Sequence, residues 1–229
     1  MMKYFLAGWA LVLFLVMPSI SAASDKEDDI SRAQRAGEVF QEIMNAPDSI
    51  PHDVLNKARC IAVIPGDKKF AFIFGANYGR GLAVCRTVTG WSSPLFLAVE
   101  GGSFGYQIGG SSTDLVLLFM NDHALHSLLS DKFKMGGDAS VAAGPVGRDA
   151  TASTDLKLTA EILSYSRSKG IFAGVSLDGT VVQADKSGDS AMYGPDVTRH
   201  DILSGGVHAP SDARTLAREL QRYSATTGE

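Results

Sequence analysis

One segment has the spacing of a nucleophilic serine. Residues 101–105 read Gly-Gly-Ser-Phe-Gly, which matches the G-x-S-x-G pattern of a nucleophile elbow and follows an apolar stretch. In such an elbow, a sharp turn from a strand into a helix lifts the serine hydroxyl toward a histidine base. Residues 106–110 contain two glycines, which oppose a helix at this place. We therefore interpret the segment as a bend between strands, with a serine hydrolase that uses Ser103 as the alternative.

A second candidate for chemistry is a pair of histidines. His123 and His126 are three residues apart in a segment with helical spacing, so both imidazoles can reach one metal ion. A metal site needs at least one further ligand, and we expect two surface histidines instead. Residues 185–189 superficially resemble a calcium loop but lack its ligand spacing, so a turn is expected there. The sequence has no P-loop, dinucleotide-binding, zinc-protease or EF-hand pattern, and it predicts no enzyme activity and no cofactor.

Several basic residues lie beside predicted turns. They are Lys68, Lys69, Arg80, Arg148, Lys157, Arg167 and Lys169. Basic side chains next to apolar surface are stabilised near a layer of lipid phosphates, so these residues are candidates for contact with an anionic lipid or membrane surface. Scattered solvated charges are the alternative. The net charge of −4 does not favour binding of nucleic acid, which usually requires a basic stripe.

The N-terminus has the features of a secretory signal. Lys3 precedes an unbroken apolar run over residues 5–17. This run fits a signal-peptide core of about 7–15 residues and is shorter than the roughly 20 residues of a transmembrane helix. Pro18 and several small residues follow, so cleavage is expected after Ala23. We expect an exported protein, periplasmic or secreted, with an uncleaved N-terminal anchor as the alternative.

Residues 24–229 are predicted to form a single domain, because no Pro- or Ser-rich linker divides them. Helical spacing of apolar residues predicts helices over 24–45, after Pro51, after Asn121 and from Ser211. Apolar runs of strand length cover residues 60–64, 70–76, 82–85, 95–99, 115–120, 160–165, 171–177 and 181–182. Because Gly and Asp separate these runs at short intervals, they are typical of antiparallel hairpins.

Glycine is frequent inside the predicted strands, where it marks bulges, bends or close backbone approach. The chain has 24 glycines, many of them in residues 101–110 and 136–147. We therefore predict an α+β fold: a curled antiparallel sheet or barrel-like core, with helices at both ends of the chain and one inserted helix.

The chain has two cysteines, Cys60 and Cys85. In an oxidising compartment such a pair usually forms a disulfide, and that is our prediction. Two free buried thiols are the alternative.

Short sequence blocks, several of them rich in glycine, occur in order along most of the chain. They include KARCIAVIP at 57–65, YGRG at 78–81, WSSP at 91–94, GGSFGYQIGG at 101–110, TDLVLL at 113–118, GGDASVAAGPVG at 136–147, SYSR at 164–167, KG at 169–170, AGVS at 173–176, YG at 193–194 and IL at 202–203. Over about residues 30–220 these blocks resemble the SYLF-domain family, also called the actin-binding domain of yeast endocytic proteins.

This resemblance implies a non-enzymatic module that binds lipid or membranes, with phosphoinositide binding in eukaryotic members and actin-filament binding in fungal ones. Exported members look bacterial, where actin is not an available partner, so we expect an anionic lipid or an envelope protein instead. A structural envelope protein that acts through a protein partner is the alternative function. The predicted helix over 24–45 departs from the eukaryotic pattern, because it is acidic and so attracts anionic lipid less. Its acids are Asp25, Glu27, Asp28, Asp29, Glu38 and Glu42, against Lys26, Arg32 and Arg35.

Overall fold

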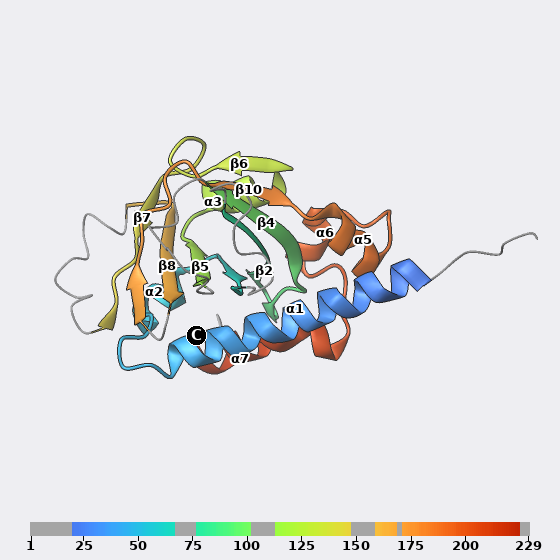
Figure 1. The fold of residues 1–229 in the computed structure, drawn as a ribbon, viewed down its shortest axis with the longest axis horizontal. Coiled ribbons are helices and arrows are strands. Elements are labelled where there is room, and N and C mark those ends of the chain that lie inside the picture. The colour runs from blue at the N-terminus through green and yellow to red at the C-terminus, as the bar shows by residue number, and fades with distance from the viewer. Residues whose placement is uncertain (1–19, 67–76, 102–112, 148–158, 169–170, 225–229) are drawn as a thin grey trace, which may run out of the picture.

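A curled ten-stranded sheet runs through the centre of the protein, with helices on both of its faces (Figure 1). The structure, a computed structural model, describes residues 20–66, 77–101, 113–147, 159–168 and 171–224. The strands lie in the order β6-β10-β4-β2-β1-β5-β8-β7, while β3 pairs with β2 and β9 with β8. Among the strand pairs of these described residues, β7 and β8 alone run parallel. The predicted α+β fold with a curled, mainly antiparallel sheet is therefore confirmed.

The elements follow the predicted runs closely. The strands are β1 (Cys60–Ile64), β2 (Asn77–Thr87), β3 (Gly90–Trp91), β4 (Leu95–Gly101), β5 (Thr113–Phe119), β6 (Lys132–Lys134), β7 (Val141–Ala143), β8 (Ile162–Ser168), β9 (Ile171–Gly174) and β10 (Val181–Ala184). The helices are α1 (Ile20–Met44), α2 (His52–Lys57), α3 (Asp122–Leu129), α5 (Lys186–Tyr193), α6 (Arg199–Ser204), the 3-10 helix η3 (Ser211–Arg214) and α7 (Thr215–Tyr223). The four expected helices correspond to α1, α2, α3 and the η3–α7 pair.

Two short helices, α5 and α6, were not expected from the sequence. The prediction of a turn at residues 185–189 was wrong, because Asp185 is the N-cap of α5 and its side chain accepts a hydrogen bond from the backbone N–H of Gly188. Helix α6 begins with a capping box in which Thr198 and Asp201 each bond the other's backbone. Both helices are held by these local caps, which satisfy N–H groups left open at a helix start.

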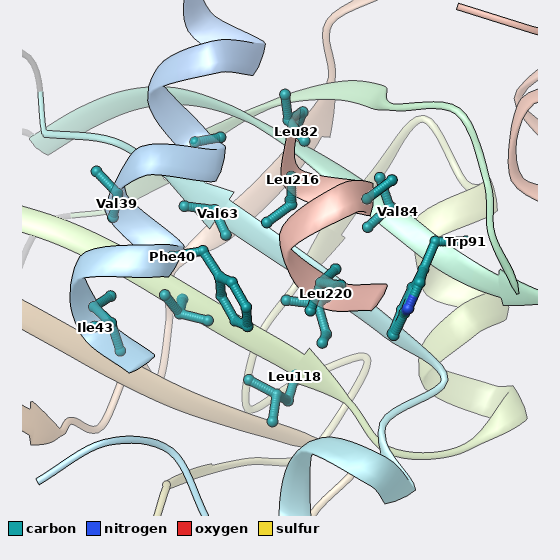
Figure 2. Close-up of a cluster of buried hydrophobic side chains, with 14 of the residues drawn as sticks. Val39, Phe40, Ile43, Val63, Leu82, Val84, Trp91, Leu118, Leu216 and Leu220 are labelled. Atoms are coloured by element: carbon teal, nitrogen blue, oxygen red, sulfur yellow. The ribbon is translucent and has the colours of Figure 1, made fainter. Parts of the chain in front are cut away.

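The sheet buries both of its faces, which explains why its central strands are continuous apolar runs. On one face, α1 and α7 cover a core that contains Phe40, Leu82 and Leu118 (Figure 2). On the other face, α3 and α6 cover a second core that contains Leu97 and Phe119. All five residues of β1 are buried, since their side chains point alternately into the two cores.

Helices α1 and α7 contact each other closely on the first face. A Cβ atom on Gly37 of α1 would lie 2.5 Å from the Thr215 Cγ2 atom and 2.8 Å from its carbonyl carbon, so glycine is required for this approach. Farther along α1, the rings of Phe40 and Tyr223 meet edge to face at 6.1 Å. The two helices therefore form one layer, and their apolar side chains point together toward the sheet (Figure 2).

The predicted disulfide between Cys60 and Cys85 is confirmed. The two cysteines are direct partners in the register of β1 and β2, and their Cα atoms are 3.9 Å apart. Both side chains are buried against the second core. The bond joins two central strands of the sheet across a sequence separation of 25 residues.

Reduction of this disulfide should lower the free energy of unfolding by ~3.5 kcal/mol, because the unfolded chain regains the entropy of an open 25-residue loop. The measurement is urea unfolding with and without dithiothreitol. A Cys60→Ala/Cys85→Ala variant is the control, since its midpoint should not respond to the reductant. Equal midpoints for the reduced and oxidised wild type would contradict the prediction.

Candidate functional site

Arg80 and Arg167, two of the predicted lipid-contact residues, lie in one row across the sheet. Arg167 on β8 is paired with Asp114 on β5. The antiparallel registers of β1 with β2 and with β5 can be continued to Pro65, the residue after β1. Pro65 then lies between Arg80 on β2 and Asp114 on β5. Residues in one row of neighbouring strands share a face, so both arginines point to the face that α1 covers.

Arg80 belongs to an ion-pair network that joins β2, α1 and α5. Its Nη2 atom is 2.6 Å from Oδ2 of Asp185, and Arg32 Nη1 on α1 is 2.9 Å from the same oxygen. Arg32 also contacts Asp29 at 2.6 Å. Burial favours the neutral form of Asp185, but hydrogen bonds from Ser187, Arg80 and the Gly188 backbone outweigh it and lower the pKa to about 2. Asp185 is therefore a fixed negative charge between two arginines.

Arg167 belongs to a second network that joins β8, β5 and the other end of α1. Its Nη2 atom is 2.7 Å from Oδ2 of Asp114, and its Nη1 atom contacts Glu42 of α1 at 2.5 Å. The second oxygen of Asp114 accepts a hydrogen bond of 2.8 Å from the backbone of Gly66, just after β1. Asp29 and Glu42 are 13 positions apart on α1, so the two networks hold the helix at points about 20 Å apart.

These contacts determine how much positive charge the row presents. The side chains of Arg80 and Arg167 are 37% and 19% exposed. The two networks together contain Arg32, Arg80 and Arg167 against Asp29, Glu42, Asp114 and Asp185. Within the described residues, the carboxylates thus neutralise the arginines, and one role of both arginines is to hold α1 on the sheet.

The other predicted contact residues, Lys68, Lys69, Arg148, Lys157 and Lys169, lie outside the described residues, as does Ser103. The described strand ends nevertheless constrain where three connecting segments start and finish. Asn77 is paired with Gly101, and Thr113 with Ser168, so β2, β4, β5 and β8 reach the same end of the sheet. Segments 67–76, 102–112 and 169–170 are all attached at this end, which we call the arginine end because Arg80 and Arg167 lie beside it.

A separate buried acid lies between α5, β4 and α6. One carboxylate oxygen of Asp189 accepts a 2.8 Å hydrogen bond from the Phe96 backbone, while the other is buried without a hydrogen-bond partner. Arg199 Nη1 is 4.0 Å from that second oxygen, and the Arg199 guanidinium donates to the Leu128 carbonyl. Burial raises the pKa of Asp189 to about 7, although the Phe96 hydrogen bond and Arg199 oppose this shift.

The two histidines of α3 do not form a metal centre within the described part of the chain. His123 Nδ1 is 2.6 Å from a carboxylate oxygen of Glu161, and both His123 and His126 are exposed. No group of three or more His, Cys, Asp or Glu side chains able to hold a metal occurs among residues 20–66, 77–101, 113–147, 159–168 and 171–224. In the same ranges, no helix has the length and apolarity that crossing a bilayer requires.

Two further surface features were not expected from the sequence. A small hollow of about 170 Å³ lies between α3, α6 and the disulfide, and its lining includes Arg59, Leu125 and His200. The outer face of η3 and α7 carries three exposed arginines at every fourth position: Arg214, Arg218 and Arg222. Their regular spacing is visible in the sequence, but the predicted contact residues lie beside turns and include no helix face.

Comparison with known proteins identifies the family of this chain. Residues 100–223 match the family model Ysc84, described as "Las17-binding protein actin regulator". The matched region runs from the end of β4 to the end of α7 and covers more than half of the chain. The chain therefore belongs to the Ysc84 family, which is the SYLF-domain family that its glycine-rich blocks resemble.

Several curated relatives are similar over most of this chain. The human SH3 domain-containing YSC84-like protein 1 is 32% identical over 201 residues, which are 84% of this chain and 58% of the relative. LAS seventeen-binding protein 3 of Saccharomyces cerevisiae is 35% identical over 184 residues, 79% of this chain and 40% of the relative. An SH3 domain-containing protein of Schizosaccharomyces pombe is 34% identical over 83% of this chain and 46% of its own length. The chain thus spans roughly half the length of these relatives.

The buried acid Asp189 should make stability depend on pH. Because its folded pKa is about 7 and its ordinary value is 3.8, the folded protein keeps a proton that the unfolded chain has lost. This stabilisation is complete below about pH 4 and is lost as the pH rises to about 7. An Asp189→Asn variant cannot lose the proton, so its unfolding free energy should gain ~4 kcal/mol relative to wild type between pH 4 and pH 8.

Urea unfolding at a series of pH values measures this difference. Asp196→Asn, which changes an exposed carboxylate close by in the sequence, is the matched control and should follow the wild-type profile. If Asp189→Asn also follows the wild-type profile, Asp189 is not protonated in the folded protein at neutral pH.

Proposed function

We propose that this protein is a non-enzymatic binding module of the cell envelope that docks on an anionic membrane surface through the arginine end of its sheet. The observation that carries the proposal is that the described strand ends flanking segments 67–76, 102–112 and 169–170 all lie at that end. Two of these segments contain Lys68, Lys69 and Lys169, which the sequence singles out as basic residues beside turns. Three cations from distant parts of the chain thus belong to segments whose described flanking residues share one end of the sheet.

The charge of these lysines matters because the two arginines of the arginine end are already paired with carboxylates. Arg80 and Arg167 contact carboxylates of α1, α5 and β5, and both contribute little uncompensated charge. Each lysine near an anionic leaflet contributes ~1 kcal/mol to membrane attraction. We therefore assign the electrostatic part of binding to Lys68, Lys69 and Lys169, with Arg148 and Lys157 as further contributors. Arg80 and Arg167 hold α1 in place beside them.

Export is supported by two separate features. The apolar run over residues 5–17 has the length of a signal-peptide core. The Cys60–Cys85 disulfide suits the oxidising environment of the periplasm or of a secreted protein. Helix α1 starts at Ile20, so cleavage after Ala23 removes only its first residues and keeps the network residues Asp29, Arg32 and Glu42.

A binding role without catalysis is supported by the family and by the strand arrangement around residue 101. The family description names a binding protein and regulator. A nucleophile elbow belongs to a parallel α/β sheet, whereas β4, which precedes Ser103, is antiparallel to both β2 and β10. The serine hydrolase alternative therefore has little support.

A protein partner is a second candidate function. Relatives of this chain carry names that refer to binding of Las17, and the family description refers to actin regulation. For an exported chain the partner is another envelope protein, with actin not expected. This candidate differs from the first in its test, because it requires no lipid.

Charge reversal at the arginine end should weaken membrane binding. We expect the purified protein to co-sediment with vesicles that contain anionic lipid and not with neutral vesicles. Lys68→Glu/Lys69→Glu should reduce partitioning by at least about thirtyfold, since loss of ~1 kcal/mol of attraction per lysine corresponds to this factor and each glutamate adds repulsion. Vesicle sedimentation over a range of lipid concentrations measures the partition coefficient.

Lys57→Glu/Lys132→Glu is the matched control, because it makes the same charge change at exposed residues of α2 and the edge strand β6. It should lower partitioning much less than the first variant does. Equal losses in the two variants would show that binding depends on net charge alone, which would contradict docking through the arginine end. Absence of binding to either kind of vesicle would remove lipid binding itself.

Interruption of the apolar run should prevent export. With the native N-terminus, we expect the envelope fraction of a bacterial host to contain a chain that begins at Ser24 and holds the Cys60–Cys85 disulfide. Leu11→Arg/Val12→Arg places two charges in the run, so the precursor should stay uncleaved inside the cell. Cell fractionation with mass spectrometry of the N-terminus measures both results, and an uncleaved wild-type chain in the membrane would support the anchor instead.

A further inference from the structure

Three arginines form a line on the outer face of the helical layer. Arg214 ends η3, and Arg218 and Arg222 follow in α7, one helical turn apart. All three are exposed, whereas Leu216 and Leu220 of the same helix are buried in the core. Because positions four residues apart lie on one helix face, the arginines point away from the sheet in a row. We call this row the arginine ridge.

The ridge differs from the arginine end in how its charges are compensated. Among the described residues, Arg214 makes no ion pair or hydrogen bond, and Arg218 donates only to the neutral Ser211 carbonyl and Thr215 hydroxyl. Arg222 has a carboxylate partner, Glu219, at 3.2 Å. Two of the three guanidinium groups are thus exposed and not paired with a carboxylate of this part of the chain.

We propose that the arginine ridge binds an acidic helix of a protein partner, with carboxylates at every fourth position of that helix. Positions four residues apart are separated by about 6 Å along a helix axis, so Arg residues on α7 and Glu or Asp residues at every fourth position of a second helix repeat with the same spacing. A guanidinium binds a carboxylate through two parallel hydrogen bonds, which favours a matched row of such pairs. This inference rests on the second candidate function and does not depend on lipid binding.

The surroundings of the ridge favour a narrow partner over a membrane. Helix α1 lies directly against η3 and α7 at Gly37 and Thr215. A flat anionic surface on this layer would also meet the outer face of α1, where the exposed Glu38 and Arg35 balance each other in charge, whereas a single helix can lie along α7 alone. The exposed large apolar side chains of the described residues are Tyr78, Val88 and Ile171, none of them on η3 or α7. The ridge therefore offers charge without the apolar anchors that insert into a bilayer.

The test uses two labelled helical peptides of identical composition and measures fluorescence anisotropy with the purified protein. One peptide has glutamates at every fourth position on one face, and the other has the same glutamates spread around the helix. We expect the first peptide to bind at least about fivefold more tightly. Arg214→Gln/Arg218→Gln should weaken its binding by about fivefold, as for two exposed ion pairs. This variant leaves the Arg222–Glu219 pair intact but removes the hydrogen bonds of Arg218 to Ser211 and Thr215, so its unfolding midpoint is measured beside that of the wild type.

The matched control is Lys57→Gln/Lys132→Gln, which removes two exposed positive charges elsewhere and should leave the affinity for the first peptide unchanged. Equal binding of the two peptides, or equal losses in the two variants, would overturn the proposal while leaving the search for another protein partner open. Loss of binding to anionic vesicles in Arg214→Gln/Arg218→Gln, with peptide binding unchanged, would identify the ridge as a lipid surface and also overturn it. Neither result bears on the effect of Lys68 and Lys69 at the arginine end.

Discussion

The fold depends on how α1 lies against the sheet. Its apolar side chains, among them Phe40 and Ile43, close one face of the strands, and burial of each side chain of this size stabilises the fold by about 1.5–3 kcal/mol. Apolar contact has no direction of its own, so it specifies the position of a helix along a sheet less sharply than paired charges do. The ion pairs of Asp29 and Arg32 at one end and of Glu42 at the other fix its position. Because buried ion pairs add little net stability, we infer that their role here is to specify this one arrangement.

Coverage of both sheet faces limits where this protein can contact anything else. The strand side chains are used in two cores, one under α1 and α7 and one under α3 and α6. Among the described residues, strand ends, sheet edges, the outer faces of helices and the hollow between α3 and α6 remain for a ligand. Three connecting segments start and finish at the arginine end, and the outer face of α7 carries the arginine ridge. Both proposed surfaces thus lie on parts of the fold that neither core uses.

Much of the fold was predictable from the sequence, because a strand buried on both faces is a continuous apolar run. The run at 60–64 is β1 with the same bounds, and the cysteine pair is the disulfide. Helix α5 was missed because its first residues, Asp185 to Asp189, are polar and include Gly188. That glycine is required by tertiary contact, since a Cβ atom there would be 3.0 Å from the Phe96 Cβ atom. No local pattern shows such a contact.

The site was less predictable than the fold. Arg80 and Arg167 are distant in sequence, and their shared row appears only when the registers of β2, β1, β5 and β8 are known. Their carboxylate partners come from α1, α5 and β5, so the sequence could identify two basic residues but not their neutralisation. The arginine ridge, in contrast, could have been predicted from the sequence. Its four-residue spacing is local, and the apolar stripe of α7 indicates that the arginines on the other face are exposed.

The position of α1 also decides whether the two proposed surfaces compete. Asp29, Arg32 and Glu42 place α1 at the row of Arg80 and Arg167. Helix α7 lies beside α1 toward the opposite end of the strands. There, Leu220 lies near Val84 and Trp91 (Figure 2). In addition, Trp91 Nε1 donates a hydrogen bond of 3.3 Å to the Ser224 hydroxyl just after α7. Helix α1 therefore separates the arginine ridge from the arginine end. In the two proposals taken together, a membrane at the arginine end would leave the arginine ridge open for an acidic helix.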